Sequence, residues 1–317
     1  MKKIKIFNTI RKELNKFEVL FDTYADTLEF GDYIKNIKGK MLRPAITIMG
    51  ARIGGGVTEK SLLAALAIEL LHNATLVHDD VIDNAIKRRG KDTFRYLHGN
   101  KQAILYGDYL LAKGLECVLK TEQFSIMRTI TQTTGEMCIG EIDQLKHSGQ
   151  FKTAEQDYYD IIYKKTASLF VCSLLVGYYS SGNNELEEII KEIGYNIGMA
   201  FQINDDLLDY DTSGSSGKDF GNDIREQKMT LPLIYALENA SQQEKDEILA
   251  LLKLPSISEA DILCIIDFIN VKGGIAYTKD VLSRYIDKAN EAIDSIPEEN
   301  NREELNNLCQ YLSKRIN

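Results

Sequence analysis

Apolar residues recur at a helical spacing over most of this chain, and only four prolines interrupt the pattern. In one segment, Leu62, Leu66, Leu70, Ala74 and Val77 share one side of a helix, because residues three or four apart are surface neighbours. The alternation that is typical of strands is almost absent. The pattern therefore predicts an all-α fold, with helices over about 61–83, 101–120, 124–146, 154–181, 185–210, 230–252, 258–270, 274–294 and 301–315.

The breaks between these helices are short, and none has the length or composition of an interdomain linker. A chain of 317 residues is long enough for one large domain or two ordinary ones. The lack of a linker in the sequence favours the first choice, so we predict a single domain over residues 1–317.

The balance of charges restricts the classes of partner. The formal net charge is −9, so the chain has no overall positive field that would attract nucleic acid. An acidic protein that binds an anionic substrate needs metal cations or clustered Lys and Arg side chains to do so. We therefore expect no nucleic-acid partner.

Three features favour a cytoplasmic protein. The most apolar stretch, residues 168–179, is shorter than the roughly 20 residues that span a membrane. The basic, amphipathic start of the chain is typical of a first helix rather than a signal peptide. The five cysteines are scattered and form no C-x-x-C pair, as expected of buried, reduced thiols. We expect a cytoplasmic location and no transmembrane segment.

Asp79, Asp80 and Asp83 place three carboxylates at the end of one predicted helix. Residues three and four apart are neighbours on a helix, and hard oxygen ligands grouped in this way suit Mg²⁺. An isolated acidic helix end exposed to solvent would have the same spacing. Arg88 and Arg89 follow, however, and their planar donor groups suit phosphate oxygens. Carboxylates for metal beside arginines for phosphate favour a diphosphate site.

A second triplet, Asp205, Asp206 and Asp209, repeats the spacing at the end of an apolar helix. Three carboxylates are not buried without partners, so we expect cations nearby; Lys218 and Lys228 lie downstream. We predict that the two long helices bring the two acidic ends together.

Between the triplets, Lys164, Lys165 and Thr166 interrupt another apolar helix. The Thr166 hydroxyl is predicted to bond to a carbonyl one turn earlier and to bend that helix. An ordinary exposed lysine pair is the alternative.

Five motifs occur in order over residues 39–232: GKMLRP, HDDVID with RRG, KTA, FQINDDLLDY and KMTLP. Together they resemble the signature of the trans-isoprenyl (polyprenyl) diphosphate synthases. The resemblance implies a bundle of antiparallel helices around a deep central cavity, and a homodimer with a possible accessory subunit. It also implies a transferase of isoprenoid biosynthesis that condenses isopentenyl diphosphate with an allylic diphosphate.

The resemblance also implies a role for each motif residue. The metal would be three Mg²⁺ ions, with ligands from Asp79, Asp80, Asp83, Asp205, Asp206 and Asp209. The allylic diphosphate would be held by Arg88, Lys165, Lys218 and Lys228. Isopentenyl diphosphate would be held by Lys40, Arg43, His72 and Arg89. The carbocation would be stabilised by the dipoles of Thr166 and Gln202, and Lys165 is counted with them as catalytic.

The length of the product is expected to depend on the helix before Asp79. In the family, aromatic residues four and five positions before the first aspartate stop elongation early. Thr75 and Ala74 stand there in this chain, and both are small. The next possible floor is Leu70 or Leu71, or a residue from a neighbouring helix. The resemblance therefore implies a product longer than farnesyl, as in quinone side chains.

Four other functions remain open from the sequence. A class I terpene cyclase also uses an aspartate-rich helix, but it lacks the Lys40 and Arg43 pair and the Arg88 and Arg89 pair. The other three are a short-chain farnesyl or geranylgeranyl synthase, the catalytic half of a two-component synthase, and an inactive partner subunit. The intact triplets and cations disfavour the last.

Overall fold

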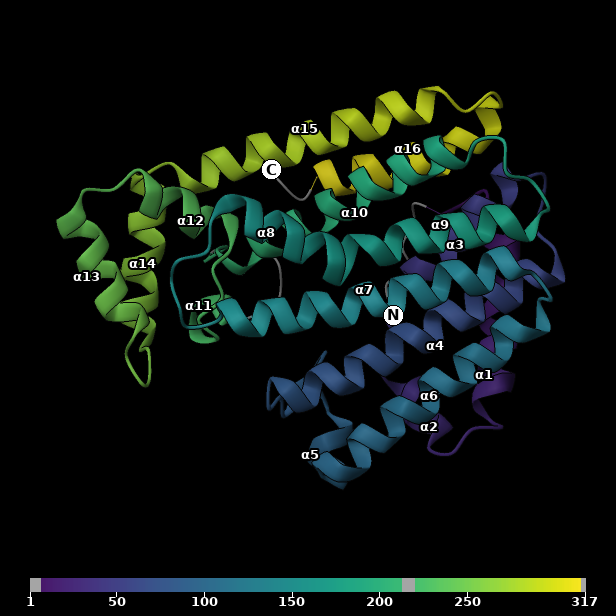
Figure 1. Cartoon of the computed structure of the whole chain (residues 1–317), viewed down its shortest axis with the longest axis horizontal. Helices are drawn as coiled ribbons and strands as arrows, with labels where there is room; N and C mark the ends of the chain where they lie inside the picture. The colour runs from purple at the N-terminus through teal and green to yellow at the C-terminus, as the bar shows by residue number, and fades with distance from the viewer. Residues whose placement is uncertain (1–6, 213–219, 315–317) are drawn as a thin grey trace. The chain divides into compact units, whose positions relative to one another are not determined.

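The computed structural model describes residues 7–212 and 220–314, apart from the side chain of Asn300. Helices dominate these residues (Figure 1). They are α1 Arg11–Ala25, α2 Gly31–Asn36, α3 Leu42–Ile53, α4 Glu59–Ile82, α5 Phe94–His98, α6 Asn100–Lys120, α7 Phe124–His147, α8 Glu155–Ile162, the π-helical turn η1 Tyr163–Ala167, α9 Ser168–Ser180, α10 Glu187–Asp209, α11 Asn222–Arg225, α12 Leu231–Glu238, α13 Gln242–Leu252, α14 Glu259–Val271, α15 Gly274–Asp294 and α16 Glu299–Ser313.

The prediction of an all-α fold is confirmed, and one predicted helix is divided. The segment 230–252 contains α12 and α13, because Ser241 starts a new helix by exchanging hydrogen bonds with Glu244 in a capping box. The predicted break at 87–92 is a small antiparallel hairpin of β1 Lys87–Arg88 and β2 Lys91–Asp92. Helices α2, α5 and α11 are too short for the periodicity to predict.

The described residues form two compact units, which we describe separately. Unit 1 contains Met1–Thr134, Phe170–Gly194 and Ala292–Leu308, and unit 2 contains Gly135–Leu169, Tyr195–Glu291 and Cys309–Asn317. Every boundary between these ranges falls inside a helix. The single domain and the meeting of the two acidic helix ends stay predictions.

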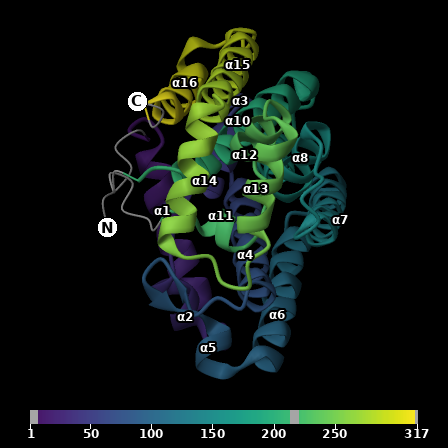
Figure 2. The same cartoon turned by 90° about the vertical axis from the view of Figure 1, so that its left-hand side faces the viewer.

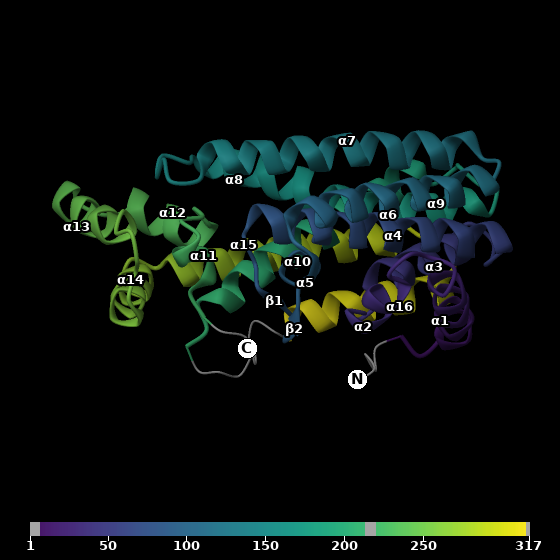
Figure 3. The same ribbon diagram turned by 90° about the horizontal axis from the view of Figure 1, so that it is seen from below.

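In unit 1, α4 lies along α6 and also packs on α3 (Figures 1 and 3). The start of α4 is set by Thr58, whose side chain caps the helix in a reciprocal pair with Ser61. Gly107 and Gly114 of α6 face α4, and a Cβ on Gly114 would lie 3.3 Å from the Ala67 carbonyl oxygen. The small residues let the two helices approach closely.

Helices α3 and α9 cross in unit 1 with their backbones in contact. A Cβ on Gly177 would lie 1.9 Å from the carbonyl oxygen of Thr47, and a Cβ on Gly50 would lie 2.1 Å from that of Leu174. Only glycine therefore fits at either position of this crossing.

In unit 2, α14 packs against α12 and α13 (Figure 2). Their buried side chains form an isoleucine- and leucine-rich core. Ile262, Ile265 and Ile269 of α14 are fully buried there, at the spacing of one helix face. Tyr210, the residue after α10, belongs to the same core. This core therefore anchors the end of the helix that carries the second aspartate triplet.

Two segments have the length and hydropathy of membrane-spanning helices, namely α4 and the continuous stretch Glu155–Ser180. Their apolar windows are 67% and 72% buried inside the structure, as in the core helices of a globular protein. The expectation of no transmembrane segment stays a prediction.

All five cysteines are free thiols, and the expectation that they are buried is wrong for two of them, Cys138 and Cys264, which are exposed.

Candidate functional site

The first aspartate triplet ends α4 with one buried and two more accessible carboxylates. Asp80 is buried, and Arg88 Nε donates to its Oδ1 at 2.8 Å. Its Oδ2 is also buried and has no hydrogen-bond partner among the described residues. Burial raises the pKa of Asp80, and the charge of Arg88 opposes that rise. Asp79 is half-buried and Asp83 is exposed.

In the hairpin after α4, the side chains of Arg88 and Arg89 bind different partners. Arg89 and Gly90 form the two-residue turn with φ of 53° and 75°, the left-handed values that such hairpins require. Arg89 Nη1 donates to the Ile37 carbonyl oxygen at 2.9 Å. A Cβ on Gly39 would lie 2.5 Å from the same Nη1. The turn thus joins the RRG motif to the GKMLRP motif.

Arg43 and His72 meet inside unit 1. Arg43 Nη1 donates to His72 Nε2 at 3.0 Å, so Nε2 is the unprotonated ring nitrogen. Burial, followed by the charge of Arg43, lowers the pKa of His72 well below its usual value. His72 is therefore neutral at neutral pH and carries its proton on Nδ1. Burial lowers the pKa of Arg43 to about 10, which leaves the guanidinium charged.

A buried carboxylate that the sequence analysis missed lies behind these cations. Glu69 is 5% exposed, and its pKa is raised by burial and lowered by the charges of Arg43 and Arg89. Asn73 Nδ2 donates to its Oε1 at 3.4 Å. The sequence does indicate Glu69, as a lone glutamate within an apolar helix, one turn before His72.

The predicted chain-length residues lie on two sides of α4. His78 contacts Gly107 of α6, and Ala74 lies one helical turn before it on the same side. Leu71 and Ala74 are both buried. Thr75 is half-buried, lies one turn before Asp79, and donates its hydroxyl proton to the His72 carbonyl oxygen at 2.8 Å.

In unit 2, a chain of side-chain hydrogen bonds leads from η1 to the second triplet. Thr166 Oγ1 donates to Gln202 Oε1 at 2.8 Å, and Gln202 Nε2 donates to Asp206 Oδ1 at 2.7 Å. The hydroxyl of Tyr158 donates to Asp206 Oδ2 at 2.7 Å. The structure has a π-helical turn at Thr166, and the predicted bend of the helix stays a prediction. The predicted bond to a backbone carbonyl is wrong, because the Thr166 hydroxyl donates its hydrogen bond to Gln202 Oε1.

Asp206 is the buried member of the second triplet. Burial raises its pKa to about 7, while hydrogen bonds from Tyr158 and Gln202 oppose the rise. Within unit 2, neutral donors therefore satisfy this carboxylate, where the sequence predicted cations. Tyr158 was missed, since nothing in the sequence distinguishes it among the sixteen tyrosines.

The other two aspartates of this triplet are half-buried. Asp209 accepts the backbone N–H groups of Asn222 and Asp223 at 3.0 and 2.9 Å, so it caps the short α11. Lys228, a predicted phosphate ligand, forms an ion pair with Glu226. Lys218, another predicted phosphate ligand, lies outside the described residues.

Lys165 is held by α7. Its Nζ lies 2.5 Å from Glu141 Oε2 and donates to Gln144 Oε1 at 3.2 Å. Sequence reasoning missed both partners, because they lie more than twenty residues away on another helix. The lysine pair is thus not merely exposed to solvent.

The predicted site residues divide into two groups, one in unit 1 and one in unit 2. Lys40, Arg43, His72, Arg88, Arg89 and the first triplet belong to unit 1, and Lys165, Thr166, Gln202, Lys228 and the second triplet belong to unit 2. Over residues 7–212 and 220–314, no three His, Cys, Asp or Glu side chains converge into a preformed metal cage.

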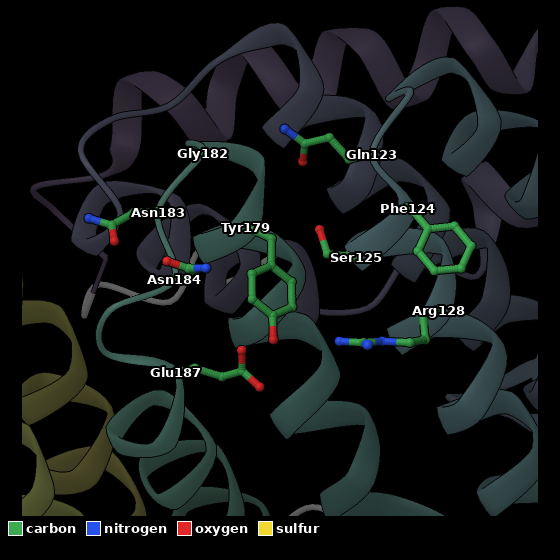
Figure 4. A pocket seen from close by; sticks show the side chains of 9 residues that line it. All are labelled: Gln123, Phe124, Ser125, Arg128, Tyr179, Gly182, Asn183, Asn184 and Glu187. Atoms are coloured by element: carbon green, nitrogen blue, oxygen red, sulfur yellow. The ribbon is translucent and has the colours of Figure 1, made fainter.

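A separate hollow of about 350 Å³ lies in unit 1, where α7 and α10 begin (Figure 4). Its wall includes Gln123, Arg128, Tyr179 and Glu187. None of the predicted site residues lines it, so it is distinct from the sites described above.

The chain is similar to known proteins over most of its length. A sequence profile described as polyprenyl synthetase matches residues 26–268. Heptaprenyl diphosphate synthase component 2 of Geobacillus stearothermophilus is 35% identical over 281 residues, covering 87% of this chain and 86% of that protein. The crystal structure of a decaprenyl diphosphate synthase from Rhodobacter capsulatus has a TM-score of 0.89 at 29% identity, covering 99% of each chain. A polyprenyl synthase from Caulobacter crescentus CB15, complexed with calcium and isoprenyl diphosphate, has a TM-score of 0.88 at 30% identity, covering 98% of this chain and 97% of that one.

Proposed function

The chain belongs to the polyprenyl synthetase family, and we propose that it condenses isopentenyl diphosphate head-to-tail with an allylic diphosphate to form an all-trans polyprenyl diphosphate. One observation carries this proposal. Unit 1 contains both a basic group, made of Arg43, Arg89 and the neutral His72, and the carboxylates of the first aspartate triplet. A diphosphate needs such cations, and its metal needs such oxygens.

We propose that the metal is Mg²⁺, with three ions bound during the reaction. The half-buried or exposed carboxylates Asp79, Asp83, Asp205 and Asp209 fit it, as does the unpartnered Oδ2 of Asp80. When bound, Mg²⁺ neutralises the charge that develops on the departing diphosphate. Asp206 was also predicted as a ligand, but unlike Asp209 it is buried, and side chains of Tyr158 and Gln202 donate to its two oxygens, so we assign it to orienting Gln202.

The cations of the chain bind the two substrates. Arg88, Lys165, Lys218 and Lys228 hold the allylic diphosphate, and Lys40, Arg43, His72 and Arg89 hold isopentenyl diphosphate. The neutral His72 contributes by donating from Nδ1, while the charged guanidinium groups supply the electrostatic attraction. The assigned site therefore attracts two trianionic ligands despite the acidic chain.

The remaining side chains stabilise the cation that forms. The Thr166 hydroxyl donates its hydrogen bond to Gln202 Oε1, so the lone pairs of the Thr166 oxygen remain to face the allylic carbocation. After isopentenyl diphosphate attacks this cation, a proton is lost to the released diphosphate. The reaction then needs no side chain as general base.

The product is longer than farnesyl. Thr75 and Ala74 leave no aromatic barrier on α4, with Leu71 as the next floor, and the names of the relatives describe heptaprenyl and decaprenyl products. A short-chain product is the alternative, and a class I terpene cyclase is disfavoured by the family match.

One assay tests the function, the metal and the product together. The purified chain is supplied with Mg²⁺, labelled isopentenyl diphosphate and geranyl, farnesyl or geranylgeranyl diphosphate, and the dephosphorylated products are sized. We expect extension beyond farnesyl that stops when a chelator removes the metal. Release of diphosphate from farnesyl diphosphate alone would instead identify a cyclase. Extension only after a second protein is added would identify a two-component synthase.

We propose that the chain forms a homodimer through α6. Ile104, Leu115 and Leu119 make an apolar stripe on this helix and are 46%, 38% and 57% exposed. Replacing Leu115 and Leu119 with glutamate is expected to convert a dimer into a monomer, measured by light scattering after gel filtration. The same change at Val19, an exposed residue on α1 outside this stripe, should leave the dimer intact. A wild-type chain that is monomeric at micromolar concentration contradicts the proposal.

The alternative to a homodimer is a complex with an accessory subunit, which the name of the Geobacillus relative, component 2 of a heptaprenyl diphosphate synthase, supports. We propose a cytoplasmic location from the composition, which fractionation of cells would test.

A further inference from the structure

Helix α7 touches the turn η1 at a glycine. A Cβ on Gly140 would lie 2.7 Å from the backbone nitrogen of Lys165 and 2.8 Å from the Cβ of Lys164. Neither atom is the far end of a flexible side chain, so no side chain fits between the two elements. The backbone of α7 is therefore in direct contact with the turn that carries Lys165 and Thr166.

The next residue of α7 holds the Lys165 ammonium. Glu141 Oε2 lies 2.5 Å from Lys165 Nζ, and the Gln144 amide oxygen accepts a hydrogen bond from the same Nζ. The side chains of Glu141 and Lys165 are only 14% and 25% exposed. Water screens a charge pair less where it is partly buried, so this pair is held more firmly than one on the open surface.

The contacts with Glu141 and Gln144 leave one N–H donor of the Lys165 ammonium for a ligand. An ammonium has three donors, and among the described residues Glu141 and Gln144 use two. A lysine side chain without such contacts occupies many rotamers, and ordering it opposes the binding of a ligand. The contacts with α7 therefore fix the place at which the third donor meets a diphosphate.

A neighbouring ion pair gives a contrast on the same helix. Lys164 Nζ lies 2.8 Å from Asp143 Oδ2, and Asp143 is shared with Lys146 at 3.2 Å. The side chains of Lys164 and Asp143 are 34% and 23% exposed, and neither is assigned to a substrate. The contact is similar in kind but serves a lysine outside the proposed site.

We propose that Glu141 is a positioning residue, which holds the Lys165 ammonium where it binds the diphosphate of the allylic substrate. The inference rests on the proposed function for the role of Lys165. A positioning role differs from a purely structural ion pair in one respect. Loss of the Glu141 carboxylate should weaken the use of the allylic substrate and not that of isopentenyl diphosphate.

The test compares Glu141→Ala, Glu141→Gln and Asp143→Ala in the full chain. In Glu141→Ala, kcat/KM for the allylic diphosphate should fall about 10- to 100-fold, since a misplaced binding group has effects of this size. The KM for isopentenyl diphosphate should stay within about twofold. Glu141→Gln keeps an oxygen for Lys165 and should recover part of the loss. Asp143→Ala should resemble the wild type. Calorimetry with Mg²⁺ and inorganic diphosphate gives a second readout that needs no turnover, and Glu141→Ala should weaken this binding.

The possible outcomes separate the inference from the proposed function. An active wild type whose Glu141→Ala variant has unchanged constants overturns the inference alone. So does an equal loss for both substrates, or an equal loss in Asp143→Ala, because either outcome indicates a general structural role. A wild type that binds diphosphate but extends no primer overturns the function, and weaker binding in Glu141→Ala would still support the positioning of Lys165.

Discussion

Replacement of Asp79 by asparagine is expected to lower kcat about 10³-fold, which corresponds to about 4 kcal/mol of lost transition-state stabilisation. Asp79 is half-buried at the end of α4, where its carboxylate is a proposed Mg²⁺ ligand. Asparagine keeps the size and one oxygen but removes the charge, so the metal that neutralises the leaving diphosphate is bound less well. The measurement is steady-state incorporation of isopentenyl diphosphate over a range of Mg²⁺ concentrations.

The matched control for this change is Asp92→Asn. Asp92 is an exposed carboxylate on β2, paired in register with Lys87, and we assign it no role in the reaction. The Asp92→Asn variant should retain wild-type turnover and should not change the unfolding temperature by more than about 2 °C, because exposed sites contribute little to stability. An Asp79→Asn enzyme that keeps a tenth of the activity would show that this carboxylate does not bind the catalytic metal.

The second large effect is expected at the crossing of α3 and α9. Gly177→Ala should destabilise the protein by about 3 kcal/mol, at the upper end of the usual range for overpacking. The added Cβ would lie 1.9 Å from the Thr47 carbonyl oxygen and 3.0 Å from the Ala51 nitrogen. Both are backbone atoms of a helix, so the two helices must move apart and lose contact with the surrounding core. The expected fall in the unfolding temperature is at least about 5 °C.

Gly135→Ala is the matched control, because it makes the same change inside a helix. Gly135 lies on α7, and nothing lies within 4 Å of the Cβ that alanine would add. Alanine favours helix by about 1 kcal/mol over glycine, so this variant should unfold at the same or a higher temperature. Equal unfolding temperatures for the two variants would show that the crossing can relax around a methyl group. Thermal unfolding followed by circular dichroism is the measurement for both.

Local features of the sequence predicted much of the helical structure. The helix predicted over 61–83 is observed as α4, because both its apolar spacing and its capping residues Thr58 and Ser61 are properties of neighbouring residues. The division of 230–252 was missed, although Ser241 carries a capping box, because apolar spacing continues on both sides of it. Periodicity thus indicates helix but does not always indicate where one helix ends and the next begins.

The candidate site was predictable in its residue types and less so in its contacts. The proximity of Arg88 to the first triplet follows from a short connection in the chain, and the structure places it on Asp80. The partner of Thr166 was predicted wrongly, since its hydroxyl bonds to Gln202, thirty-six positions away. Glu141 was not foreseen as the partner of Lys165, because that contact depends on two helices packing side by side.

By itself, the sequence determined that the chain is helical and which acidic and basic groups stand at the helix ends, because spacing and side-chain chemistry are local properties. Only the tertiary structure decided which members of each group are buried. Asp80 and Asp206 are buried and hydrogen-bonded, whereas Asp79 and Asp205 are more accessible, although all four lie in the same pattern of spacing. The physical reason is that burial and hydrogen-bond partners depend on which neighbouring elements cover each face of a helix, and those elements come from distant parts of the chain.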